Sequence, residues 1–151
     1  MKTVSITNSY EVAPTVLWNL VVNYDDLCTI AGRAISFKGL PSGELTQGQA
    51  VTATISLLGL LPRQKYSIEI TKRDDLNLVL CTEERGAGLN MWNHTVKVWE
   101  SCGKSYLIDI VEIDAGWLTL PATLWAKFIY RRRHAPRSVL LSKSALHSAS
   151  Q

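Results

Sequence analysis

The sequence predicts an α+β fold in which a strongly curved antiparallel sheet wraps around a long C-terminal helix, with two short helices after the first strand. Most of residues 33–115 alternate between polar and apolar side chains, which is typical of strands with one buried face. The connections between these strands are short, which favours antiparallel pairing. After Gly116 the apolar residues recur instead at helical spacing.

The first elements are a strand and two helices. The alternation in TVSITNSYEV predicts the strand. Pro14 suits the first turn of a helix, and PTVLWNLVVNY continues with helical spacing. DDLCTIAG predicts the second helix, with Asp25 or Asp26 as its N-cap and Gly32 at its end.

Six strands and a long helix follow. The strands are expected in RAISFKGL, QAVTATISL, QKYSIEITK, LVLCTEE, MWNHTVKVW and SYLIDIVEI. The helix should present a broad apolar face that comprises Leu118, Pro121, Leu124, Trp125, Phe128 and Ile129. Pro136 should kink or end it. We expect a single domain over residues 1–142, and we expect the small and polar residues 143–151 to fray.

Composition excludes several classes of protein. With 46% hydrophobic and 19% charged residues, the 151 residues suit one globular domain. No apolar run reaches the ~20 residues of a membrane span, so no stable membrane insertion is expected. The start of the chain has no signal-peptide pattern, and Cys28, Cys81 and Cys102 fit free thiols in the cytoplasm. The three histidines are scattered, so no metal site is expected. The sequence contains no phosphate-binding glycine loop before a helix, so no cofactor is expected.

The positive charge is concentrated at the C-terminal end. Residues 1–116 carry a net charge of −3, whereas residues 117–151 contain six Lys or Arg and no acid. The run Arg131–Arg133 could contact a phosphate-rich partner. Cations are also favoured at the end of a helix, and the rest of the chain is negative, so we expect no nucleic-acid partner.

The hairpin in HTVKVWESCGKSYLID places a histidine and an aspartate close together. If Ser101 and Cys102 form the turn, His94 faces Asp109 on the apolar side of the sheet, where their Cβ atoms would lie ~5 Å apart. The pair could hold the two strands in register as a satisfied buried pair. Alternatively, Asp109 could orient His94 as an acid or base. We favour the structural interpretation.

Particular segments resemble the helix-grip superfamily, also called START-like or SRPBCC, which includes birch-pollen-allergen-like and polyketide cyclase/dehydrase-like proteins. SYEVAPTVLWNLVVNYDDL is similar to the family's first strand and two helices, and GELTQGQAV to its turn, with Gly48 as the turn glycine. GAGLNMWNHTVKV and GKSYLIDIVEI resemble a bacterial subgroup with a Trp-x-His pattern. A second histidine often follows there, but Val96 occupies that position. The resemblance covers residues 3–141 and implies the helix-grip fold.

This resemblance and the many large aromatics predict a cavity that binds a small hydrophobic, lipid- or polyketide-like ligand. The expected ligand-binding residues are Trp18, Tyr24, Tyr66, Trp92, His94, Leu107, Trp117, Trp125 and Phe128. An alternative is a polyketide cyclase or aromatase with His94 and Asp109 as catalytic residues and Tyr66 or Arg63 positioning a carbonyl. A second alternative is a non-enzymatic partner protein that uses the basic helix end. Glu84 and Arg85 are expected to be a solvated pair, or else to guard a pocket mouth. A free sheet edge makes a homodimer possible.

Overall fold

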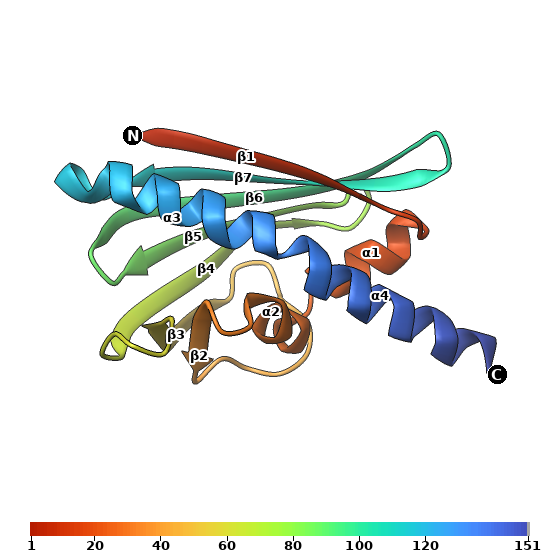
Figure 1. The fold of residues 1–151 in the computed structure, drawn as a ribbon, viewed down its shortest axis with the longest axis horizontal. Helices are drawn as coiled ribbons and strands as arrows, with labels where there is room; N and C mark the ends of the chain where they lie inside the picture. The colour runs from red at the N-terminus through yellow and green to blue at the C-terminus, as the bar shows by residue number, and fades with distance from the viewer. Residues whose placement is uncertain (151) are drawn as a thin grey trace.

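The computed structural model describes residues 1–150 and consists of a curved seven-stranded antiparallel sheet with helices on its concave face (Figure 1). The strands are β1 (Lys2–Tyr10), β2 (Ile35–Lys38), β3 (Ala50–Leu57), β4 (Gln64–Asp74), β5 (Val79–Gly86), β6 (Leu89–Ser101) and β7 (Lys104–Asp114). Their order is β1-β7-β6-β5-β4-β3-β2, so the first strand pairs with the last and β1 and β2 form the edges. The predicted fold class is confirmed.

Two short helices connect β1 to β2. Helix α1 (Pro14–Val21) begins at Pro14, as predicted. Helix α2 (Tyr24–Ala31) ends before Gly32, whose φ of 58° is accessible to glycine. Its N-cap is Asn23, whose Oδ1 accepts hydrogen bonds from the N–H groups of Asp25 and Asp26 at 2.9 and 3.2 Å. The prediction of Asp25 or Asp26 as the cap was therefore wrong, because both already lie within the first turn.

The hairpin between β6 and β7 turns at Cys102 and Gly103 and not at Ser101 and Cys102. Both turn residues have positive φ, 51° and 76°, as in the two-residue turn that matches the twist of paired strands. The register consequently differs by two residues from the predicted one, and His94 pairs with Val111. A shift of two residues preserves the face of every side chain, so the predicted inner wall remains intact.

The C-terminal segment forms two consecutive helices where one was predicted. After a short 3₁₀ turn (Gly116–Leu118), α3 (Thr119–Arg132) and α4 (His134–Ala149) meet at Arg133. The helical hydrogen bonding is interrupted because Pro136, in the first turn of α4, has no N–H to donate to the carbonyl of Arg132. Residues 143–149, expected to fray, are helical but exposed, and residue 151 lies outside the described residues.

The core has two parts. The smaller cluster joins β1, β6 and β7 directly to α3, through residues that include Val4, Val111 and Ile129. The larger cluster joins α1, α2 and α4 to β3–β7 and surrounds most of the hollow described below. No helix of residues 1–150 is long and apolar enough to cross a membrane.

Candidate functional site

A cavity of about 440 Å³ lies between the sheet and the helices. Strands β2–β6 form its sheet wall, and α1, α2, α3 and the α3–α4 junction cover it. Residues of β1 and β7 do not line it, because those strands pack directly against α3. Most of the wall is apolar and includes Leu20, Leu27, Ile30, Phe37, Ile55, Ile68, Leu80, Val96, Ala122 and Ile129. The hollow has the size and character of a small-molecule pocket.

Five of the predicted ligand-binding residues line this cavity: Tyr24, Tyr66, Trp92, His94 and Trp125. Tyr66 comes from β4, and Trp92 and His94 come from β6. Tyr24 reaches the cavity from α2 and Trp125 from α3. Tyr24 is fully buried, and its hydroxyl donates to Oε1 of Gln49 at 2.9 Å. The structure therefore brings together the aromatic wall that the sequence suggested, although with fewer members.

The other four predicted ligand-binding residues do not line this cavity. Trp18 is a buried residue of α1, and its indole N–H donates to Oδ1 of Asp75 at 2.7 Å. Leu107 is buried in β7, which does not reach the cavity. Trp117, in the 3₁₀ turn before α3, is 87% exposed, and Phe128 is 42% exposed on the outer side of α3.

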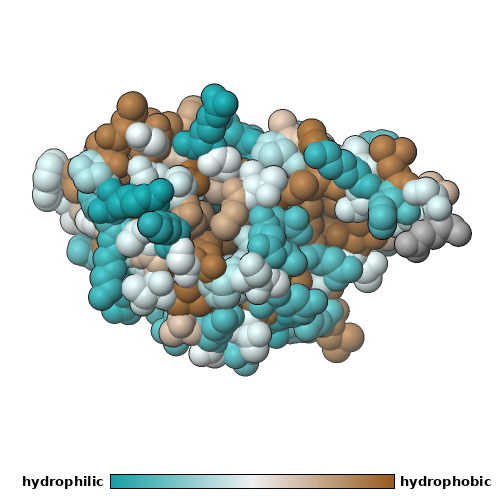
Figure 2. Space-filling view, turned by 90° about the horizontal axis from the view of Figure 1, so that it is seen from below, coloured by the Kyte–Doolittle hydropathy of each residue, from teal (hydrophilic) through white to brown (hydrophobic). Residues whose placement is uncertain are grey.

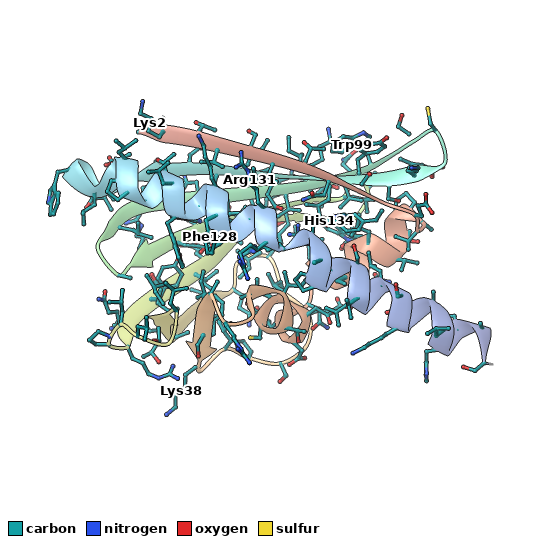
Figure 3. All side chains as sticks on the ribbon, viewed as in Figure 1. Lys2, Lys38, Trp99, Phe128, Arg131 and His134 are labelled. Atoms are coloured by element: carbon teal, nitrogen blue, oxygen red, sulfur yellow. The ribbon has the colours of Figure 1, made fainter. Side chains whose placement is uncertain are left out.

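Helix α3 has apolar residues on two faces, and only one of these faces lines the cavity. Ala122, Trp125 and Ile129 face the cavity, whereas an outer stripe is exposed that comprises Trp117, Leu120, Leu124 and Phe128. Phe128 and the basic side chain of Arg131 are labelled along this helix in Figure 3. Figure 2 shows hydrophobic surface interspersed with hydrophilic groups, including at the end of the molecule that α4 forms. Spacing alone does not say which of two apolar faces is buried.

His94 and Asp109 are in contact despite the shifted register. Nε2 of His94 lies 2.8 Å from Oδ1 of Asp109, across a diagonal of the β6–β7 pair. Asp109 is completely buried and belongs to the core behind the cavity, whereas His94 lines the cavity itself. The ring of Tyr130 packs on the imidazole in an edge-on arrangement, with 4.9 Å between centroids. His94 is thus held from two sides.

The carboxylate of Asp109 also binds Arg137 of α4, a partner that the predicted hairpin does not include. Nη1 of Arg137 donates to Oδ2 at 3.0 Å and Nη2 donates to Oδ1 at 3.3 Å, which makes the ion pair bidentate. Both side chains are buried, with Arg137 only 4% exposed. The pair connects the sheet to α4 across the core.

Charge and hydrogen bonding fix the protonation of this cluster. Burial alone would raise the pKa of Asp109, but the charge of Arg137 and the hydrogen bond from His94 outweigh it and hold that pKa well below its usual range. Burial would likewise lower the pKa of Arg137, and the charge of Asp109 raises it instead. Asp109 is therefore a carboxylate, and Nε2 of His94 must carry the proton that it donates. Nδ1 is therefore the ring nitrogen that remains for a hydrogen bond to a ligand.

A second polar group surrounds Glu84 in the cavity wall. Tyr66 donates its hydroxyl to Oε2 of Glu84 at 2.6 Å, and Thr82 donates to Oε1 at 2.8 Å. Burial, followed by the charge of Glu84, raises the pKa of Tyr66 well above its usual value. The expectation of a solvated Glu84–Arg85 pair was wrong, because exposed Arg85 lies 3.8 Å from Glu83 and Glu84 points inward.

The basic run at the helix junction is divided between surface and interior. Arg131 and Arg132 are exposed, whereas Arg133 is 6% exposed and lines the cavity. The guanidinium of Arg133 lies over the ring of Tyr130, with 4.2 Å between its Cζ and the ring centroid. His134, labelled at the junction in Figure 3, packs on Tyr10 of β1 at 5.0 Å. The run Arg131–Arg133 therefore does not form one continuous basic surface.

The two buried arginines did carry a signal in the sequence. Residues at intervals of three or four are buried along the whole C-terminal segment: Ala126, Ile129, Tyr130, Arg133, Arg137 and Leu141. This spacing places Arg133 and Arg137 on the inner face of the helices. The positive charge of these residues suggests a solvated helix end, and this masks their helical spacing in the sequence.

Comparison with solved structures supports the fold. Protein CV1439 from Chromobacterium violaceum aligns with a TM-score of 0.73 and 10% identity over 93% of this chain and 97% of that chain. Protein Ms6760 from Mycobacterium smegmatis aligns with a TM-score of 0.74 and 14% identity over 92% and 90%. Ara h 8.0201, which has the birch-pollen-allergen-like fold, aligns with a TM-score of 0.64 and 17% identity over 90% and 97%.

No family model matches the chain, and no curated protein matches its sequence. At such low identities the structural likeness establishes the fold and not the activity. The chain has the helix-grip fold, as the sequence resemblance implied.

Proposed function

We propose that this protein binds a small hydrophobic molecule, of lipid-like or polyketide-like character, in the cavity between β2–β6 and α3. The observation that carries the proposal is the hollow of about 440 Å³ with a largely apolar wall. Protein interiors are normally packed as densely as organic crystals, and large internal voids are destabilising. A cavity of this size therefore favours a binding role over a purely structural one.

The composition of the wall supports the same role. Aliphatic side chains supply most of the surface, and Trp92 and Trp125 add flat aromatic area. A few polar groups, around Glu84 and His94, could orient a ligand by hydrogen bonds. Proteins with this fold generally bind hydrophobic ligands, which agrees with the proposal.

The neutral fluorescent probe N-phenyl-1-naphthylamine tests the proposal. Its emission should rise on binding to the wild-type protein with one site per chain. Ala122 lines the cavity from α3, so Ala122→Phe should fill part of the hollow and lower the affinity about tenfold or more. Ala135→Phe places the same side chain at an exposed position of α4 and should leave the affinity unchanged. Equal affinities of both variants and wild type would contradict binding in the cavity.

Proton transfer at His94 is a second candidate function. Its support is that His94 lines the cavity with Nε2 already hydrogen-bonded, so that Nδ1 is the nitrogen left for a ligand. The ion pair with Arg137 weighs against this candidate, because it already neutralises Asp109. An enzyme should lose turnover in His94→Ala while retaining its fold, whereas a carrier should still bind the neutral probe.

A further inference from the structure

We propose that Arg133 binds the anionic head of the ligand, and that the natural ligand is therefore a hydrophobic carboxylate. This inference rests on the proposed function and adds the chemical class of the ligand. It begins from the position of Arg133 at the α3–α4 junction, where its side chain lines the cavity.

Arg133 is a buried cation without an anionic partner in the part of the chain that the structure describes. It is 6% exposed, and none of its guanidinium nitrogens lies within 4.0 Å of a carboxylate of residues 1–150. Its Nε is buried and has no hydrogen-bond acceptor. The other buried arginine differs, because Arg137 binds Asp109 at 3.0 Å. Even the partly exposed Arg73 has acidic partners, Glu44 and Asp75, each at 2.9 Å.

The two acids nearest the cavity are already engaged. Asp109 accepts hydrogen bonds from Arg137 and His94. Glu84 accepts one hydrogen bond on each oxygen, from Tyr66 and Thr82. Neither carboxylate forms an ion pair with Arg133, so the protein itself leaves a guanidinium directed at the cavity.

The contact with Tyr130 compensates only part of the cost of burying Arg133. The ring of Tyr130 attracts the guanidinium, but it carries no net charge and cannot replace an anionic partner for a buried cation. An anion supplied by a ligand would complete the site. Guanidinium groups bind carboxylates through two parallel hydrogen bonds, and the rest of the wall is apolar, so the matching ligand has a carboxylate head and an apolar body.

Decanoate and decan-1-ol provide matched probes, because they share chain length and differ in the charge of the head. Titration calorimetry at pH 8 should show that wild type binds decanoate about tenfold more tightly than decan-1-ol. Arg133→Gln should abolish this preference while retaining decan-1-ol binding. Arg132→Gln removes the same charge from an exposed neighbouring position and should keep the preference.

The outcomes separate the inference from the proposed function. Equal binding of the two probes by wild type, or an unchanged preference in Arg133→Gln, would overturn the role of Arg133 and leave hydrophobic binding intact. Absence of binding by N-phenyl-1-naphthylamine and both decyl probes would remove the proposed function as well. If circular dichroism shows that Arg133→Gln does not fold, the wild-type preference decides together with Arg133→Lys, which should retain it because the charge remains.

Discussion

Asp109 of β7 is clamped between Arg137 of α4 and His94 of β6, with Arg137 donating to both of its oxygens. All three side chains are buried or nearly so. The contact ties the C-terminal helix to the strand that pairs with β1. The positive charge of Arg137 balances the buried negative charge of Asp109. A neutral histidine could not balance that charge.

Removing one partner of this ion pair should be strongly destabilising. Arg137→Met leaves the carboxylate of Asp109 buried with only His94 as a partner, and we expect a loss of ~3–5 kcal/mol in the free energy of unfolding. The double variant Asp109→Asn, Arg137→Met should lose less than the sum of the two single variants. Urea denaturation measures these values, and exposed Arg132→Met is the matched control, expected within ~0.5 kcal/mol of wild type. If Arg137→Met is as stable as wild type, the Asp109–Arg137 ion pair does not stabilise the fold as we expect.

Stability should fall at acid pH because of Asp109. Its pKa is held well below the ordinary value of ~3.9 in the folded protein, so the unfolded chain takes up a proton first as the pH falls. The stabilisation is fully present above about pH 5 and is lost progressively as the pH drops through ~4 toward the folded-state pKa. Urea denaturation between pH 7 and pH 3 should show a shallower fall for Asp109→Asn than for wild type or exposed Glu100→Gln. Parallel curves for all three would show that Asp109 is not the group responsible.

Two glycines should respond differently to alanine. Gly86 ends β5 with a φ of +116°, and a Cβ there would collide with the backbone carbonyl of Lys65 on β4. Gly103 lies in the β6–β7 turn with a φ of +76° and has open space around it. We expect Gly103→Ala to cost ~1–2 kcal/mol from backbone strain alone, and Gly86→Ala to cost ~4 kcal/mol or more. Thermal unfolding compares the two, and similar losses would contradict the close approach of β4 and β5 at Gly86.

Two neighbouring aromatics of α3 should differ in their effect on ligand binding. Trp125 lines the cavity, whereas Phe128, whose ring centroid lies 5.6 Å away, is on the exposed side. Trp125→Ala should weaken or reposition binding of N-phenyl-1-naphthylamine, changing its affinity about tenfold or shifting its emission, because it alters the wall. Phe128→Ala should change neither quantity. A larger effect of Phe128→Ala would locate the binding site on the outer stripe of α3.

The sequence predicted the parts of this fold that depend on periodicity. Strand alternation placed His94 and Asp109 on one face, and that prediction survived a register error of two residues because the side-chain period is two. The turn itself was misplaced because Cys102 adopts a positive φ, which its residue type does not signal. The pairing of the long strands β6 and β7 places the turn at Cys102 and Gly103 and not at Ser101 and Cys102.

The candidate site was less predictable because tertiary packing selects among equivalent faces. Helix α3 has apolar residues on two faces, so Trp125 and Phe128 are alike in sequence although only Trp125 lines the cavity. Arg133 and Arg137 resemble the solvated end of a helix until their helical spacing with Ile129 and Leu141 is considered. The burial of Arg137 depends on Asp109, which lies 28 residues earlier in the sequence, whereas Arg133 packs on Tyr130 one helical turn before it.

Intermolecular nuclear Overhauser effects between N-phenyl-1-naphthylamine and the methyl groups of the protein test the central claim most directly. The account predicts cross-peaks from the probe to Ile68, Leu80 and Val96, whose side chains line the cavity. Cross-peaks confined to Leu120 and Leu124 of the exposed stripe, or none at all, would contradict binding between the sheet and the helices.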